Sequence, residues 1–207
     1  MSANGAARIA ARTPNQLDSG QAALYASITG GPRAQGPQHF ALTADDGSLL
    51  GPFNAFLLSP QLGGALQELG AAVRYATALT PRMRELAILI VASHWRSAFE
   101  RHAHEAVGRA AGLSDAELAA IRDGRALDLH DGLERATVEL CRALVAGDVG
   151  DELWASVLEV LDERTVFELS TLVGYYATLA LQLRVFRVDV PDVTAPDVGA
   201  SDGETSA

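Results

Sequence analysis

The sequence predicts an all-α domain, a compact bundle of about eight helices. Apolar residues recur at the three- and four-residue spacing of helices, and no segment of strand length alternates convincingly between apolar and polar residues. Helix-start signals also recur, in which serine, threonine or aspartate precedes proline or lies three residues before glutamate. The chain has 207 residues, of which 48% are hydrophobic, so one such domain has enough residues to bury a sizeable core.

The first half of the chain predicts three helices and a long loop. An amphipathic helix over 15–29 ends at Gly30-Gly31-Pro32, and the proline- and glycine-rich residues 31–52 form the loop. Ser59-Pro60 then opens a helix that reaches about residue 76. Thr80-Pro81 opens the next helix, whose segment 86–92 is apolar on every side. We therefore expect this helix at the centre of the bundle.

The second half predicts the remaining helices from their caps. Ser97 to Glu100 and Ser114 to Glu117 fit capping boxes, the first opening a helix that ends near Ala111 before Gly112. Asp131 opens a helix that ends near residue 146, and Asp151 caps a shorter one.

Asp162 precedes the last helix, 164–185, which has apolar residues on more than one face. Because one small domain would struggle to bury all of them, we expect this helix at a subunit interface. These residues are Val166, Phe167, Leu169, Leu172, Val173, Tyr175, Tyr176, Leu179, Leu181 and Leu183.

We expect a flexible N-terminus over 1–13, the helical domain over 14–188 and an acidic, disordered tail over 189–207. The tail carries five acidic residues and no arginine, so it holds half of the formal net charge of −10.

Composition excludes several classes of function. All 16 basic residues are arginine, which excludes lysine Schiff-base chemistry and the lysine-dependent phosphate loop. The sequence pI of about 4.9 disfavours nucleic acid as a partner. Residues 1–12 lack the apolar run of a secretory signal, and the longest apolar stretch, 86–92, is too short to cross a membrane. We expect a cytoplasmic protein without nucleic-acid or membrane partners.

The densest group of titratable residues lies between His94 and Glu105. On a helix, Ser97, Glu100 and His104 share one face, so Glu100 is placed to orient the His104 imidazole for acid/base chemistry. Glu100 is equally well explained as the glutamate of the capping box. His102 lies about 200° round the helix from His104, so at most one of the two faces a given pocket.

Glu85 is unusual because it lies beside the apolar segment 86–92. Desolvation there would raise the pKa of its carboxyl and make it a proton donor near neutral pH. A simpler interpretation is an ion pair with Arg82 or Arg84 at the start of the helix.

Other candidates are weaker. The i, i+4 histidine pair of helical zinc sites is missing, so we expect no metal, and a site would have to use His94, Glu100 and His104. Arg96, Arg101 and Arg109 form either an anion-binding strip or a solvated face. The single cysteine, Cys141, lies in an apolar segment that suits core packing.

Three segments resemble the carboxymuconolactone decarboxylase family, whose superfamily includes the alkylhydroperoxidase D-like proteins. They are residues 79–92, 99–106 and 111–118, and residues 51–60 resemble the longer branch of the family. The resemblance implies a helical bundle that assembles as a homotrimer or homohexamer. It also implies that Glu85, Ser97, Glu100 and His104 occupy the motif positions.

The motif favours the decarboxylase branch over the peroxidase branch. Ser97 and Glu100 stand where the peroxidase branch has its two cysteines, and a dithiol cycle cannot run on Cys141 alone. In the decarboxylase-type pattern Glu-Trp-x-x-His, Glu100 and His104 match the first and last positions. Arg101 stands in place of the tryptophan.

The resemblance therefore implies a cofactor-independent lyase that acts on a small carboxylated lactone or carbonyl metabolite. Isomerisation would suit the same residues. His104 is the expected proton donor, Glu100 orients it and Glu85 is a second proton-transfer group. Arg96 or Arg101 would bind a substrate carboxylate, with His94, Ser97 and His102 as further substrate contacts. The alternatives are a hydroperoxide-reducing protein and a non-catalytic oligomeric binding protein.

Overall fold

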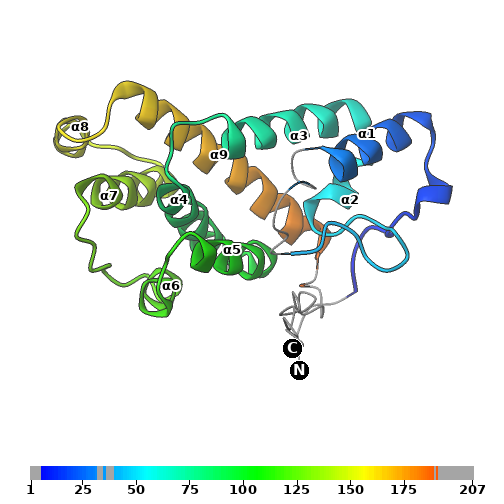
Figure 1. Cartoon of the computed structure of the whole chain (residues 1–207), viewed down its shortest axis with the longest axis horizontal. Helices are drawn as coiled ribbons and strands as arrows, with labels where there is room; N and C mark the ends of the chain where they lie inside the picture. Colours follow the sequence, from blue (N-terminus) through cyan, green and yellow to red (C-terminus); the bar gives the residue numbers. More distant parts are fainter. Residues whose placement is uncertain (1–5, 32–34, 36–39, 189, 191–207) are drawn as a thin grey trace, which may run out of the picture.

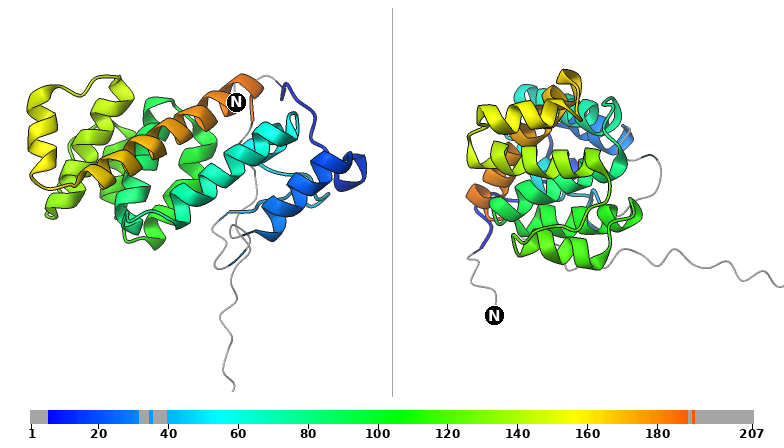
Figure 2. Two further views of the ribbon diagram at one scale, coloured as in Figure 1. Left: turned by 90° about the horizontal axis from the view of Figure 1, so that it is seen from above. Right: turned by 90° about the vertical axis from the view of Figure 1, so that its left-hand side faces the viewer.

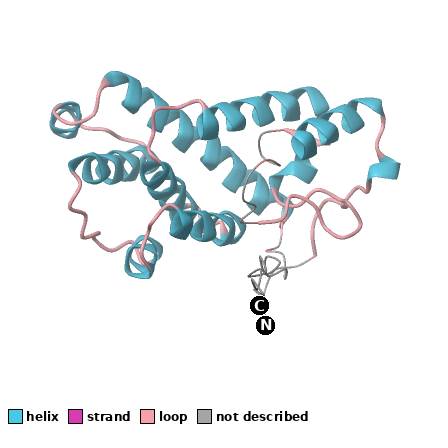
Figure 3. Ribbon diagram, in the orientation of Figure 1, coloured by secondary structure: helices cyan, strands magenta, loops and turns pink. Residues whose placement is uncertain are grey.

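The computed structural model describes residues 6–31, 35, 40–188 and 190, and in these residues it contains helices and no strands (Figures 1 and 3). Within the described residues, a short 3₁₀ turn, Pro14–Gln16, precedes nine α-helices. The prediction of an all-α bundle is confirmed, with one helix more than expected. The α-helices are α1 (Ser19–Gly30), α2 (Pro52–Phe56), α3 (Pro60–Tyr75), α4 (Pro81–His94), α5 (Ala98–Ala110), α6 (Asp115–Arg122), α7 (Gly132–Ala146), α8 (Asp151–Leu158) and α9 (Glu163–Phe186).

Most predicted helix starts are confirmed by local hydrogen bonds. The side chains of Thr80, Ser114, Asp131 and Asp162 accept hydrogen bonds from backbone N–H groups in the first turns of α4, α6, α7 and α9. Ser114 and Glu117 form the complete capping box. These caps depend only on residues within a few positions of one another, which is why the sequence predicts them.

The capping box expected at Ser97 and Glu100 is wrong. The Ser97 side chain makes no capping hydrogen bond, and the buried Glu100 carboxyl makes no hydrogen bond of normal geometry to a described residue. Helix α8 is preceded by Gly150 rather than capped by Asp151. Asp18 caps α1, so that helix begins four residues later than predicted.

Helix α4 lies at the centre of the bundle, as its apolar sequence predicts. It packs against α5, α7 and α9, and residues 85–92 are all buried. At its start Arg82 pairs with Glu117 at 2.7 Å and with Glu134 at 2.6 Å, which joins α4 to α6 and α7. The alternative pairing of Arg82 with Glu85 is therefore wrong.

Helix α9 spans the molecule and lies beside α3 (Figure 2, left). It is long and apolar enough to cross a membrane by length and composition alone, but 56% of its apolar window is buried inside the bundle, as in the core helix of a soluble protein. The single chain buries eight of the ten apolar residues that suggested an interface, and only Phe167 and Leu181 stay exposed. One chain therefore buries most of this helix but not all of its apolar residues.

The structure describes most of the N-terminal segment but very little of the C-terminal one. Within the expected flexible N-terminus, the Arg8 N–H donates to the carbonyl of Phe186 and the Arg12 N–H to the Asn54 side chain. The expected acidic tail, 189–207, lies outside the described residues apart from position 190.

Candidate functional site

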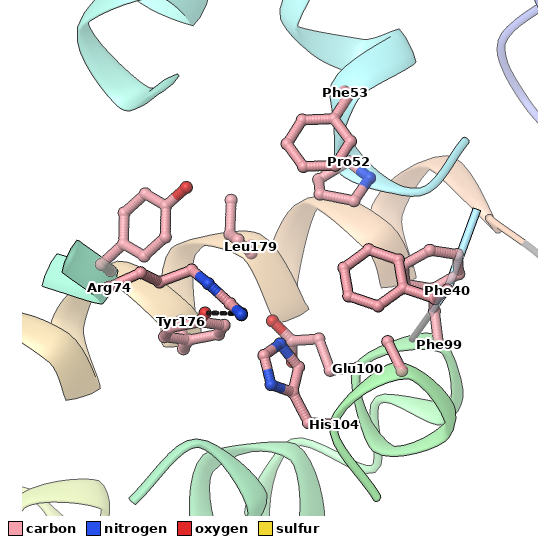
Figure 4. Close-up of a pocket in the computed structure, with 11 residues that line it drawn as sticks. Phe40, Pro52, Phe53, Arg74, Phe99, Glu100, His104, Tyr176 and Leu179 are labelled. Carbon is pink, nitrogen blue, oxygen red and sulfur yellow. Dashed lines mark hydrogen bonds between the residues drawn. The ribbon is translucent and has the colours of Figure 1, made fainter. Parts of the chain in front are cut away.

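A pocket opens between α5, α9 and the last turn of α3 (Figure 4). It encloses about 390 Å³ of empty space, its open mouth included. Three polar side chains, Arg74, Glu100 and His104, point into this space from α3 and α5. The described residues that complete the lining are Phe40, Pro52, Phe53, Phe99, Ala103, Tyr175, Tyr176 and Leu179.

Glu85 and His104 form a buried pair beside the pocket. Nδ1 of His104 lies 2.7 Å from Oε2 of Glu85, and both residues are almost completely buried. With Glu85 ionised, Nδ1–H donates to the carboxylate, and this hydrogen bond fixes the ring and its tautomer. The rings of Tyr176 and His104 pack at right angles to each other, with centroids 5.2 Å apart. The expected pairing of Glu100 with His104 is therefore wrong, because Glu85 holds the ring.

The pKa of Glu85 shifts in the opposite direction from the one that the sequence predicts. Burial alone would raise this pKa, but the neighbouring His104, together with Arg74 and Arg84, lowers it below its usual value. Arg84 approaches the carboxylate at 4.0 Å. Glu85 does not line the pocket, so it acts on His104 rather than on a ligand.

Glu100 has the raised pKa instead. Burial raises the pKa of its carboxyl to about 8, and an interaction with the Ser97 hydroxyl opposes this shift only in part. Neither carboxyl oxygen has a hydrogen bond of normal geometry to a described residue. A carboxylic acid with such a pKa, facing a pocket, has a proton to donate to a bound molecule at neutral pH.

Arg74 is a site residue that the sequence analysis missed. Its guanidinium donates to the Tyr176 hydroxyl at 3.4 Å. Burial alone would lower its pKa, but the Tyr176 hydroxyl and the Glu85 carboxylate raise it, so the group is charged. Its Nε has no hydrogen-bond partner among the described residues. The one signal in the sequence is a lone arginine in the last turn of the helix 60–76.

The apolar wall of the pocket depends on a close approach between Gly51 and Phe99. Gly51 has a φ of 63°, which favours glycine, and a Cβ at this position would overlap the ring of Phe99. The turn that starts α2 can therefore lie directly on α5. Phe53 from α2 and Phe99 from α5 then close the pocket.

The remaining predicted binding residues lie elsewhere. His94 and His102 are exposed, Arg101 is half-buried, and none of the three lines the pocket that contains His104. Arg96 and Ser97 line a separate groove on the other side of Phe99. Arg109 pairs with Asp115 at 2.9 Å.

The described residues contain no group of three His, Cys, Asp or Glu side chains that could hold a metal ion. Cys141 is completely buried, and burial raises the pKa of its thiol to about 12. At neutral pH this thiol is not a nucleophile, so its place in the core fits the packing role.

Comparisons with known proteins agree with this fold and motif. Residues 60–148 match the model of the carboxymuconolactone decarboxylase family, and this segment contains Arg74, Glu85, Glu100 and His104. No curated protein matches the sequence. A crystal structure of an Agrobacterium tumefaciens protein of unknown function, described as a candidate antioxidant defence protein AhpD, is similar with a TM-score of 0.61. Its sequence is 20% identical, and the similarity covers 68% of this chain and 98% of the other. This likeness shows the fold.

Proposed function

We propose that this chain, whose residues 60–148 match the model of the carboxymuconolactone decarboxylase family, is a cofactor-independent acid/base lyase. Its substrate is a small carboxylated lactone or carbonyl compound. The observation that carries the proposal is the pairing of two proton-transfer groups in one pocket, a neutral Glu100 and an oriented His104.

The two carboxyl groups have different roles. Glu85 is a positioning residue that holds the imidazole through Nδ1, and we assign proton exchange with a ligand to Nε2 of His104. Glu100 is the proton donor because its carboxyl is neutral near pH 7. This assignment exchanges the roles that the sequence predicts for the two glutamates.

A decarboxylation in this pocket balances without a cofactor. The bond between the substrate carbon and its carboxylate breaks, CO₂ leaves, and the electron pair moves into the conjugated lactone carbonyl. Glu100 then gives its proton to the carbon and becomes a carboxylate, which water reprotonates through the pocket mouth. When the His104 ring is protonated, its Nε2–H donates a hydrogen bond to the carbonyl oxygen. This hydrogen bond stabilises the negative charge that develops on that oxygen.

The presence of Arg74 in the pocket favours a substrate with a negative charge. Arg74 is charged, it faces the pocket, and Nε lacks a partner among the described residues. A guanidinium binds a carboxylate with two parallel hydrogen bonds. We therefore assign Arg74, rather than Arg101, to a second carboxylate that the substrate keeps.

The redox alternative has support from the fold but not from the cysteine content. AhpD-like chemistry on a thiol pair needs two cysteines, and the chain has one, which is buried with a raised pKa.

The test is a turnover assay with a panel of carboxylated unsaturated lactones in D₂O, followed by NMR. CO₂ release and deuterium at the decarboxylated carbon report the two steps. We expect Glu100→Gln and His104→Ala to lower kcat by about 10²- to 10⁴-fold, as for other general acid/base groups. We expect Arg74→Gln to raise KM, and Arg109→Gln is the control for an arginine outside the pocket.

Full turnover by His104→Ala and Glu85→Gln on an identified substrate would overturn the proposal. Hydroperoxide consumption that survives Cys141→Ser would instead favour a redox function that uses no thiol.

A further inference from the structure

A second hollow lies on the other side of Phe99, between the start of α5 and the end of α9. It encloses about 700 Å³ of empty space, its open side included. Phe99 is the one described residue that lines both this groove and the pocket of His104. Three of the residues that line the groove are arginines, Arg96, Arg184 and Arg187.

Among the described residues, the three guanidinium groups have no anionic partner. Other arginines of the chain, such as Arg82 and Arg122, form ion pairs with glutamates at 2.6–2.8 Å. No ion pair or side-chain hydrogen bond joins Arg96, Arg184 or Arg187 to a described residue. Gathering three unpaired positive charges around one hollow is unfavourable unless an anion binds there.

The start of α5 adds donors to the same groove. Ser97 is 7% exposed, and its hydroxyl makes no hydrogen bond of normal geometry to a described residue. Because Ser97 does not cap the helix, the first N–H groups of α5 also lack a side-chain acceptor. A buried hydroxyl and an uncapped N-terminus of a 13-residue helix attract an oxyanion.

The arginines at the end of α9 are not needed to satisfy the last carbonyl groups of that helix. Arginine near a helix C-terminus can satisfy the last carbonyl groups. Here the carbonyls of residues 183 to 186 already accept hydrogen bonds, from the N–H groups of Val188, Arg187 and Arg8 and from the Arg8 guanidinium. Within the described residues, these carbonyls therefore do not need the side chains of Arg184 and Arg187 as donors.

Backbone geometry also marks this groove. In the described part of the chain, the non-glycine residues with positive φ are Arg96 at 53° and Arg187 at 52°. This conformation is costly for a residue with a Cβ. Both strained positions carry arginine side chains that line the groove.

We propose that this groove is a second binding site, for a small molecule with a doubly charged oxyanion group, a phosphate or a pair of carboxylates. Arg96 faces the anion from the α4–α5 turn, Arg184 faces it from α9, and Arg187 faces it from the position just after that helix. The Ser97 hydroxyl and the N-terminus of α5 donate hydrogen bonds. The site is separate from the acid/base pocket, because the two share only Phe99 among their described lining residues.

The test is calorimetric titration of the full chain with inorganic phosphate and, separately, with succinate, at constant ionic strength. We expect saturable binding that weakens at least tenfold in Arg96→Gln and Arg187→Gln and less in Ser97→Ala. Arg125→Gln removes the same charge outside the groove and is expected to stay within twofold of the unmodified chain. Thermal unfolding of each variant confirms that it folds.

The comparison of the two anions identifies the ligand chemistry. Tighter phosphate binding supports a phosphate ester, and tighter succinate binding supports a dicarboxylate. Three results would overturn the proposal: no saturable binding of either anion, an equal loss in Arg125→Gln, or loss of binding in His104→Ala, which would place the anion in the other pocket. Because the readout is binding rather than turnover, it is independent of the lyase proposal.

Discussion

Glu85 and Glu100 are the same residue type in the same small region, yet their carboxyl groups have opposite properties. Glu85 contacts an imidazole and has a lowered pKa, whereas Glu100 contacts no counter-charge and has a pKa raised to about 8. The sequence identifies both residues and His104 from residue type and spacing. It assigns the wrong partner to His104, because the contact with Glu85 joins residues 19 positions apart on two helices.

The raised pKa of Glu100 predicts that folding stability falls as pH rises. The folded carboxyl has a pKa of about 8 and keeps its proton up to that pH, whereas the unfolded one loses it near the usual pKa of 4.5. Between these values the folded state binds more protons, so the free energy of unfolding decreases with pH, by at most about 1.4 kcal/mol per pH unit. Below pH 4.5 and above pH 8 this contribution is constant.

Urea unfolding of the chain and of Glu100→Gln between pH 5 and 9 measures this difference. We expect the difference between the two free energies to change with pH in that window, because the glutamine does not titrate. The same slope in both proteins would show that Glu100 is ionised throughout.

At the scale of helices, the sequence predicts what local side chains decide. Thr80, Ser114 and Asp162 cap the helices that they precede, and each cap lies within three residues of its donor. Helix α2 was missed because five residues next to glycine and proline carry no helical period. The failed cap at Ser97 has a different cause, since Glu100 is drawn into the pocket by its place on the buried face of α5.

The close contact of Gly51, at the start of α2, with Phe99 on α5 predicts that adding one methyl group at position 51 lowers stability. Gly51→Ala would force a residue with a Cβ to adopt φ near 63° and would place that Cβ against the Phe99 ring. Gly124→Ala meets the same backbone strain at φ 66°, but no atom lies within 4 Å of its Cβ. We expect Gly51→Ala to be the more destabilising, by about 1–3 kcal/mol from overpacking. Equal unfolding free energies for the two variants would show that the Phe99 contact has no effect.

For the whole molecule, the pocket requires elements that are distant in sequence. Arg74 from α3 and Tyr176 from α9 meet 102 positions apart, next to His104 from α5. Neither residue is marked by a motif, and their meeting depends on how α3 and α9 pack side by side. The sequence therefore predicts the fold class and the α4–α5 half of the site, while the other half follows only from the tertiary structure.

The exposed side of α9 predicts self-association. Phe167, Gly174, Thr178, Leu181 and Val185 are exposed and lie on one stripe of the helix. Phe167 is 69% exposed, a large apolar side chain in water. We propose that this stripe contacts a second copy of the chain in the trimer or hexamer that the family resemblance implies.

Light scattering during size-exclusion chromatography measures the assembly. We expect Phe167→Glu to lower the molar mass, whereas Leu133→Glu, an exposed leucine on α7, leaves it unchanged. An unmodified chain of 21.7 kDa in solution would contradict the proposal.

The position of Glu85 behind His104 has a consequence for charge in the interior. Its carboxylate touches the inner nitrogen of the ring and does not line the pocket. When the outer nitrogen takes up a proton, the new positive charge therefore appears next to a negative charge that is already in place. The surrounding side chains need not rearrange to stabilise it, and most of the reorganisation that a proton transfer would demand of water is completed when the chain folds.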